Sequence, residues 1–162
     1  MNKLILALSI IMVSCTSPVE PPSLGHQNIR YSFAKDFGLK MDGITPESAK
    51  AQFRIAAAKW SSVSGVNLVE AEFGGIMIYG RPLLGDVLGL THYRLGIVLM
   101  DTSNRKWNEL LFYKVALHEM GHALGLPHIM HDRSIMYPSI TGKYTLSSFD
   151  IARIQSIYGE NK

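Results

Sequence analysis

Two histidines four residues apart, His118 and His122, constrain this chain more than any other feature of its sequence. They fall within a predicted helix, where positions four apart lie on one face and can reach one metal ion. Gly125 can end that helix and Pro127 forbids its continuation, so the chain turns back and can deliver His128 to the same place. The spacing therefore predicts a metal site made of three histidines.

Glu119 follows the first histidine directly and points about 100° away around the helix. This offset keeps its carboxylate out of the ligand set but near the position that three nitrogen ligands leave open. A catalytic zinc needs such a vacancy, because water must lose a proton near neutral pH and attack a carbonyl that the metal polarises. We therefore predict a catalytic zinc site in which Glu119 is the general base. Histidines placed only for packing would not require helix, turn and ligand spacing to agree.

The complete motif, His118-Glu119-x-x-His122-x-x-Gly125-x-x-His128, resembles that of the metzincin metallopeptidases. The run from Ser134 to Pro138 resembles the methionine turn of these enzymes, in which Met136 would form a structural floor beneath the metal.

Within the metzincins the chain is similar to the matrixins, the matrix metalloproteinase family (peptidase family M10). Pro138 stands two residues after Met136, as in matrixins, where serralysins and astacins carry tyrosine. The stretch Leu146 to Gly159 is similar to the matrixin closing helix, and Ala49 to Trp60 to the first helix. The resemblance implies an α+β catalytic domain, a zincin fold with a twisted mixed sheet and three helices. It also implies a zinc-dependent endopeptidase acting on proteins or peptides.

The resemblance further implies where a substrate binds. An extended peptide would lie along an edge strand, at Leu90 and Thr91, while the segment from 129 to 139, with Tyr137 and Pro138, would wall the specificity pocket. Lys114 falls where the family lines that pocket, four residues before the first histidine. We hypothesise that it makes the pocket shallow or favourable to a polar or acidic side chain. The alternative is a solvated helix residue.

Two departures from the matrixin pattern concern metals. Matrixins usually hold a second, structural zinc, but only His92 matches a ligand for it here, so we predict one catalytic Zn²⁺ and no structural zinc. Asp86 and Asp101 could touch Ca²⁺, yet two isolated acids fall short of the several oxygen ligands that it needs, so calcium stays open. Three remaining side chains are expected to be structural or solvated: His26, His131 and Tyr137.

The pattern of apolar and capping residues predicts alternating strands and helices. Strands are expected at 29–33, 68–71, 76–79, 87–92 and 97–100. Helices are expected from Thr45-Pro46-Glu47 through Trp60, from the cap Asn108 through Leu124, and from Ser147 onward.

The amino-terminal residues resemble an export signal. In residues 1–15, Lys3 precedes an uncharged run of about ten residues, shorter than the roughly 20 needed to cross a bilayer. The end of this run also resembles a bacterial lipoprotein cleavage box, in which Cys15, the only cysteine, would become lipidated. The alternative is an ordinary signal that removes Cys15. Residues 16–27 are a Pro-rich linker, and residues 28–162 form the matrixin-like metallopeptidase domain in this prediction.

Composition limits the partners. The net charge is +3 and the basic residues are scattered, so nucleic acid is not an expected partner. We expect an exported monomer, either extracellular or a cell-surface or outer-membrane lipoprotein, which touches a membrane only through a lipid on Cys15. The rival function is a lipid-anchored, zinc-containing module that binds protein without cutting it. Glu119 speaks against this rival, as does the lack of a fourth ligand at suitable spacing.

Overall fold

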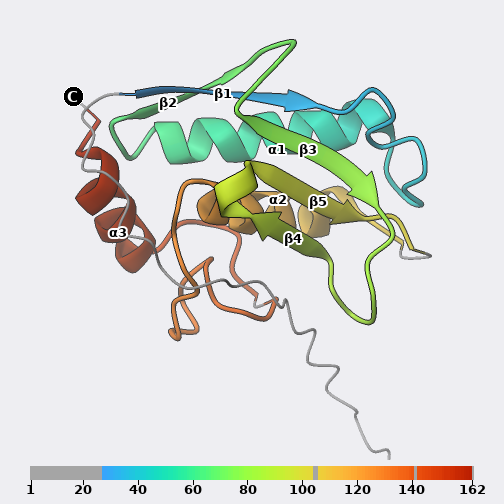
Figure 1. Ribbon diagram of the computed structural model, residues 1–162. Coiled ribbons are helices and arrows are strands. Elements are labelled where there is room, and N and C mark those ends of the chain that lie inside the picture. Colours follow the sequence, from blue (N-terminus) through green and yellow to red (C-terminus); the bar gives the residue numbers. More distant parts are fainter. Residues whose placement is uncertain (1–26, 104–105, 141, 162) are drawn as a thin grey trace, which may run out of the picture.

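The computed structural model describes residues 27–103, 106–140 and 142–161 (Figure 1). The predicted signal peptide, Cys15, His26 and all of the predicted linker except residue 27 lie outside these ranges. Within them the strands are β1 (Gln27–Phe33), β2 (Val66–Glu70), β3 (Ile76–Arg81), β4 (Gly89–His92) and β5 (Ile97–Asp101). The helices are α1 (Pro46–Ser61), α2 (Glu109–Ala123) and α3 (Ser148–Tyr158), and a 3-10 turn at Tyr93–Leu95 joins β4 to β5.

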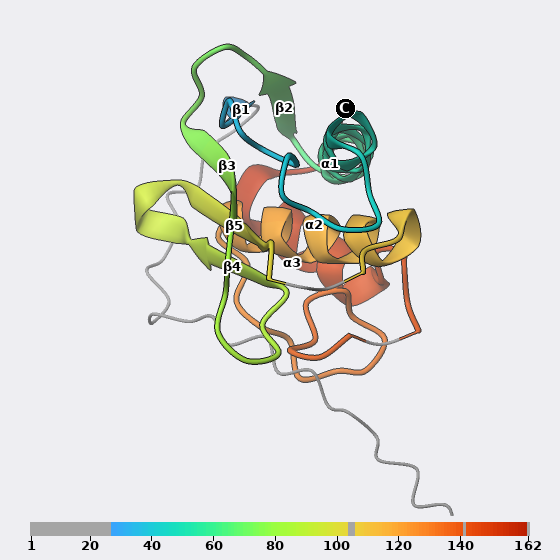
Figure 2. The same ribbon diagram turned by 90° about the vertical axis from the view of Figure 1, so that its right-hand side faces the viewer.

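The strands form one mixed sheet in the order β2-β1-β3-β5-β4. β4 runs antiparallel to β5, whereas the other neighbouring strands are parallel. Both views place α1 and α2 on one side of the sheet, with α3 beyond one end of α2 (Figures 1 and 2). The predicted α+β fold with a mixed sheet and three helices is confirmed for the described part of the chain, and β4 lies at an edge of the sheet.

The helix starts follow the capping signals in the sequence. Thr45 accepts a hydrogen bond from the amide of Ser48, and Asn108 accepts one from the amide of Leu111. Ser147 opens α3 with a capping box. The buried face of α1 is also the predicted one, made of Ala49, Phe53, Ala56, Ala57 and Trp60. Strand ends differ from the predicted ones by at most two residues. The predicted strand from 87 begins at Gly89, because the amide of Val87 closes a turn onto Leu84.

The core between the sheet and the two long helices is aromatic. Ring centroids lie 5.0 to 6.3 Å apart within one cluster, whose members are Phe33, Phe37, Phe53, Trp107 and Phe112. The indole nitrogen of Trp60 on α1 donates to the carbonyl of Leu117 on α2, at 2.9 Å. α2 is therefore held from one side by rings and by a buried hydrogen bond, which fixes the helix that carries the first two histidines.

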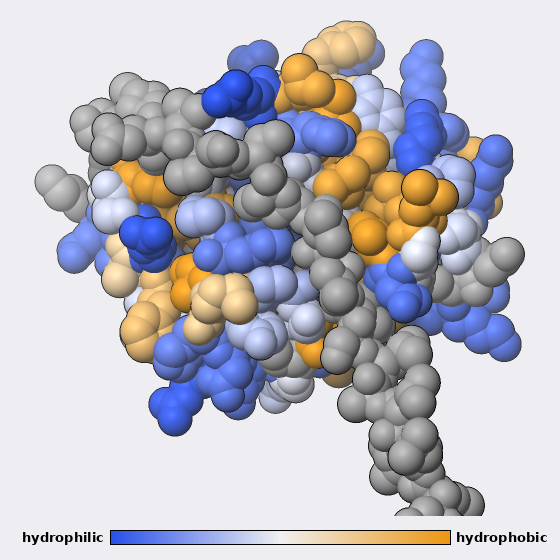
Figure 3. Space-filling model, turned by 60° about the horizontal axis from the view of Figure 1, so that its bottom comes forward, coloured by the Kyte–Doolittle hydropathy of each residue, from blue (hydrophilic) through white to orange (hydrophobic). Residues whose placement is uncertain are grey.

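Several large apolar side chains are exposed at the surface. The face seen from below Figure 1 shows separate apolar patches between polar ones (Figure 3). Leu84, between β3 and β4, and Met130, after His128, are among the exposed large apolar side chains. None of the helices in residues 27–103, 106–140 and 142–161 is long and apolar enough to cross a membrane.

Candidate metal centre

The three predicted histidines meet at one point. His118 and His122 lie one turn apart on α2, and His128 reaches them from the segment after the helix. One ring nitrogen of each lies within 4.8 Å of those of the other two. The ring centroids are 4.6 to 5.3 Å apart. The three rings therefore offer a metal ion three nitrogen ligands from different directions.

The turn after α2 brings the third histidine back. Gly125 adopts a positive φ of 92°, as its predicted role as helix terminator requires. The amide of Leu126 donates to the carbonyl of Gly121, and the amide of Ile129 donates to the carbonyl of Met136. These bonds fix both ends of the segment that holds His128.

Backbone carbonyls set the tautomer of two of the rings. The Nδ1 atom of His118 lies 2.7 Å from the carbonyl oxygen of Ile135, and that of His122 lies 2.7 Å from the carbonyl oxygen of Leu126. A carbonyl only accepts, so each Nδ1 carries the proton and each Nε2 keeps a lone pair. This is the tautomer that binds a metal through Nε2.

A set of buried polar atoms without partners marks the same place. Within the described residues, the buried side-chain nitrogen and oxygen atoms that lack a hydrogen-bond partner are the Nε2 atoms of the three histidines and the Oε1 atom of Glu119. Leaving one such atom unsatisfied costs about 1 to 3 kcal/mol. An ion bound by the three Nε2 atoms would satisfy their lone pairs, and neutral imidazoles are preferred ligands of zinc. The residues present therefore fit a zinc ion.

Burial keeps these imidazoles neutral. It lowers the pKa of His118 well below its ordinary value, with a further contribution from the neighbouring His122. Burial lowers the pKa of His122 to about 4 and also lowers that of His128. At neutral pH all three rings are therefore in the unprotonated form that a metal needs.

Glu119 directly follows His118 on α2, and its side chain is completely buried. Its Oε2 atom accepts a hydrogen bond of 2.7 Å from the hydroxyl of Thr91 on β4. Burial raises the pKa of Glu119 to about 8, although the hydrogen bond from Thr91 lowers it. A carboxyl group whose proton affinity is raised towards neutral pH suits the transfer of a proton.

Met136 lies fully buried against α2. A Cβ atom added at Gly121 would overlap its sulfur and would lie 2.9 Å from the ring of Trp60. The residue at position 121, directly before His122, must therefore be small for the methionine turn to pack this closely.

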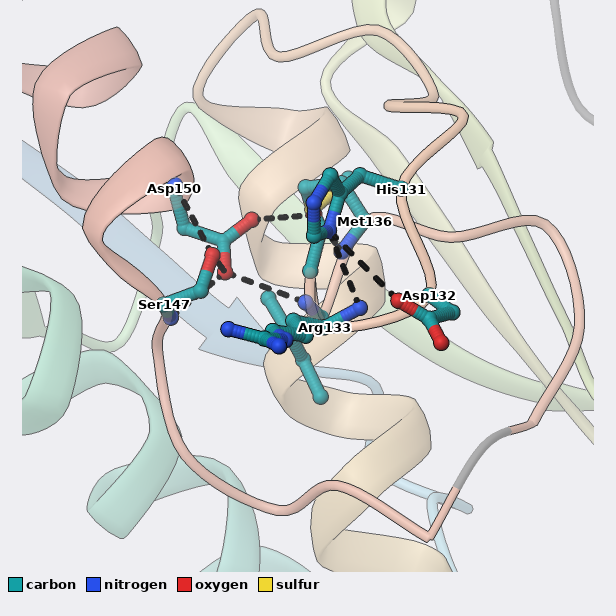
Figure 4. Close-up of polar contacts among 8 residues, drawn as sticks. His131, Asp132, Arg133, Met136, Ser147 and Asp150 are labelled. Atoms are coloured by element: carbon teal, nitrogen blue, oxygen red, sulfur yellow. Dashed lines mark hydrogen bonds and ion pairs between the residues drawn. The ribbon is translucent and has the colours of Figure 1, made fainter.

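Sequence reasoning missed the group that holds this turn. Asp150 on α3 is fully buried and binds the turn through both oxygens (Figure 4). Oδ1 accepts from the hydroxyl of Ser134 at 2.5 Å, and Oδ2 accepts from the amide of Ile135 at 3.0 Å. Oδ2 also accepts from the amide and hydroxyl of Ser147. The sequence signal was the capping box, which explains the bonds to Ser147 but not those to the turn.

The predicted substrate-pocket residues occupy several places. Leu90 is half-buried on β4, whereas the hydroxyl of Thr91 faces inward onto Glu119. The ammonium of Lys114 on α2 lies 6.0 Å from the ring centre of Tyr144 in the segment before α3. Two further residues lie half-buried after the methionine turn: Tyr137 and Pro138.

The other residues singled out from the sequence lie apart from the three histidines. His131 packs against Phe149, with ring centroids 4.3 Å apart (Figure 4 labels His131). His92 is exposed at the end of β4. Asp101 is buried at the end of β5, where its Oδ1 atom accepts from the amide of Leu83 and from the amide and hydroxyl of Ser103.

A cavity of about 550 Å³ lies elsewhere, between α1 and the β1–β2 edge of the sheet. Its walls include Asn28, Ser61 and Asn67, and none of the three histidines. The metal centre is therefore defined by its side-chain chemistry and not by this cavity.

The mixed sheet with an antiparallel edge strand, the His-Glu helix, the glycine turn to a third histidine and the buried methionine turn are together consistent with a metzincin catalytic domain. Residues 99–159 match the family Peptidase_M10, the matrixins. The chain therefore contains a matrixin-like catalytic domain. This family implies zinc and protein substrates.

Proteins of similar sequence agree with this assignment. The chain is 29% identical to metalloendoproteinase 1-MMP of Arabidopsis thaliana, over 86% of this chain and 45% of that protein. It is 42% identical to interstitial collagenase B of Mus musculus, over 87% and 36%. It is 32% identical to the hatching enzyme of Paracentrotus lividus, over 84% and 26%. The chain thus spans less than half the length of these relatives.

Proposed function

We propose that this chain is a zinc-dependent endopeptidase in which His118, His122 and His128 hold one catalytic zinc ion and Glu119 is the general base. One observation carries the proposal. Within the described residues, the buried side-chain nitrogen and oxygen atoms without a hydrogen-bond partner are three imidazole nitrogens and one carboxylate oxygen, all on residues of a single motif. The matrixin-like sequence supports the same reading.

The residues divide the work of peptide hydrolysis. Zinc bound here would supply a Lewis acid that polarises the scissile carbonyl and makes water easier to deprotonate. The carbonyls of Ile135 and Leu126 hold two imidazoles in the required tautomer. Glu119 would take the proton of the attacking water on Oε1 and pass it to the leaving nitrogen.

The edge strand β4 supports a mode of substrate binding. Of the described strands, β4 pairs with β5 alone, so its other edge offers main-chain groups to an extended peptide. Such pairing would orient the peptide, with Leu90 beside it. Tyr137 and Pro138 would form part of the pocket wall in the segment from 129 to 139.

Lys114 is our candidate for specificity in that pocket. It stands four residues before His118, hence on the same face of α2, and its ammonium approaches Tyr144. We expect it to favour polar or acidic side chains or to shorten the pocket. Identical cleavage preferences for the wild type and Lys114→Leu on a peptide library would rule out this role.

The proposal includes the finer assignments of metal and location. We expect one zinc ion per chain, no structural zinc, and a monomer. Calcium is left open, since Asp86 and Asp101 alone supply fewer oxygen ligands than it needs. We propose export by residues 1–15, with lipidation of Cys15, a linker over 16–27 and the catalytic domain over 28–162. Metal analysis tests the stoichiometry, and mass spectrometry of membrane fractions, with Cys15→Ala as control, tests the lipid.

The deciding experiment is cleavage of a quenched fluorescent peptide library by the purified protein, with and without a zinc chelator. Glu119→Ala is the control, because it removes the base while keeping the ligands. Chelator-sensitive cleavage that Glu119→Ala loses supports the endopeptidase. Stoichiometric zinc binding without any cleavage would instead favour a protein-binding module.

A further inference from the structure

The inner face of β4 shapes the environment of Glu119. Thr91 is 6% exposed although it lies on an edge strand. Its Oγ1 atom is 2.7 Å from Oε2 of Glu119 and 3.2 Å from the main-chain oxygen of the same residue. Oε2 is the preferred acceptor, because it is closer to the hydroxyl than the main-chain oxygen is and a carboxylate oxygen accepts more strongly than a carbonyl.

Gly89 stands two residues earlier and therefore faces the same side of the strand. A Cβ atom at this position would lie 2.5 Å from Oε1, 2.6 Å from Cγ and 2.7 Å from Cδ of Glu119. β4 thus leaves space for the carboxylate at one position and supplies a hydroxyl to it at the next inward position. The two contacts limit how the end of the Glu119 side chain can rotate.

We propose that Thr91 is a positioning residue for the general base: its hydroxyl holds Oε2 of Glu119, so that Oε1 is the oxygen that accepts the proton. The proposal rests on the proposed endopeptidase function. Its basis is the asymmetry of the carboxylate, in which Oε2 has a hydroxyl donor and Oε1 is buried without a partner. Without the hydroxyl, the carboxylate would rotate and less of it would be ready for proton transfer.

The position of β4 gives this contact a second consequence. Thr91 pairs with Val98 on β5, and β4 is also the edge strand proposed to orient an extended peptide. The strand that aligns the substrate would then also align the base. β4 would then position both the substrate and the base, so fewer groups would have to be positioned independently.

The test compares Thr91→Val, which keeps the shape but removes the hydroxyl, with Thr91→Ser, which restores it. We expect Thr91→Val to lower kcat about 10- to 100-fold with KM within about twofold, and Thr91→Ser to stay within about threefold of the wild type. Zinc affinity, measured by competition with a chromophoric chelator, should be unchanged in both variants.

A readout independent of turnover is the binding of a peptide hydroxamate, whose acidic hydroxyl needs a nearby acceptor. Its Kd should rise about tenfold in Thr91→Val and recover in Thr91→Ser. The matched control is Ser64→Ala, which also removes a buried hydroxyl. The hydroxyl of Ser64 donates to the carbonyl of Trp60 at 2.9 Å. Ser64→Ala should lose stability but keep kcat.

Each outcome decides the matter. A folded, zinc-loaded Thr91→Val with wild-type kcat and hydroxamate affinity overturns the positioning role. Equal losses in Thr91→Val and Thr91→Ser would reduce it to packing. If Thr91→Val does not fold, Thr91→Ala and Thr91→Ser supply the same comparison. If the wild type cuts no peptide, the proposed function fails, whereas the hydroxamate series still decides what Thr91 does.

Discussion

Two completely buried carboxyl groups, Glu119 on α2 and Asp150 on α3, have opposite surroundings. Both oxygens of Asp150 are bound, by two hydroxyls and two amides in all. Glu119 has the hydroxyl of Thr91 on Oε2 and no partner on Oε1. The protein itself supplies hydrogen bonds to both oxygens of Asp150, whereas Oε1 of Glu119 is left for a metal, water or substrate to contact.

The difference separates structural from chemical use of the same group. Hydrogen bonds to both oxygens hold the carboxyl group of Asp150 in place, so it can serve as a fixed anchor. Burial with few donors raises the pKa of Glu119 to about 8, which costs stability but gives the group affinity for a proton. The anchor also supports the site: Asp150 binds the amide of Ile135, whose carbonyl accepts from His118.

The largest expected effect breaks the Glu119 side of this comparison. Glu119→Gln should lower kcat by about 100- to 10,000-fold, because the amide cannot take a proton, while zinc binding persists. The metal-free variant should melt at a higher temperature than the wild type, since a buried ionisable group is gone. Peptide kinetics, metal analysis and thermal unfolding measure these three effects. Retained turnover would remove Glu119 from the mechanism.

The next effect breaks the Asp150 side. The carboxyl group of Asp150 accepts four hydrogen bonds, whereas the side chain of Asn offers one acceptor oxygen and an NH₂ group that only donates. Asp150→Asn should therefore lower the free energy of unfolding by about 3 kcal/mol. Urea unfolding measures it. The matched control is Asp36→Asn, since Asp36 is exposed and pairs only with exposed Arg81 among the ion pairs of the described chain; it should change stability by less than about 1 kcal/mol. Equal effects at both positions would contradict the anchor role.

The pH dependence of the metal-free protein sharpens the comparison further. The pKa of His122 falls from 6.5 to about 4 on folding, so the stability present above pH 6.5 should be lost as the pH drops towards 4. The pKa of Glu119 rises to about 8, so its contribution is present below pH 4.5 and is lost as the pH rises through 8. Each group changes stability by at most about 1.4 kcal/mol per pH unit.

Urea midpoints of the metal-free protein between pH 4 and 9 test both limbs. Glu119→Gln should remove the loss on the alkaline side and leave the acidic side in place. In Glu119→Gln, which lacks the opposing contribution of Glu119, a flat curve from pH 6.5 to 4 would mean that burial does not hold the histidines neutral. Saturating zinc should oppose the acidic loss near its upper end, because the ion binds only the folded, unprotonated site.

The smallest effect lies at the other end of the molecule, where an exposed ion pair joins α1 to β2. Arg54 makes two hydrogen bonds to Glu70, of 2.6 and 2.9 Å. Arg54→Gln should cost only about 0.2 to 1 kcal/mol, because solvent screens the pair. Peptide turnover should not change. A large fall in kcat would show coupling between this ion pair and the metal centre.

Local signals in the sequence were enough for much of the fold. Thr45, Asn108 and Ser147 begin the three helices because each side chain bonds an amide only three residues away. The same range of interaction explains why the spacing of His118 and His122 and the glycine turn at Gly125 were readable. Strand positions were also readable from apolar alternation, but their ends were not, because pairing partners fix them.

The sequence by itself determined the ligand types, their approach to one point and the residue suited to be the base, since helix geometry and one turn relate them. Tertiary structure alone decided that Asp150 holds the methionine turn and that Thr91 faces Glu119. These contacts join segments that lie 15 and 28 residues apart along the chain. Their existence depends on how α3 packs against the methionine turn and β4 against α2, and no local pattern encodes that packing.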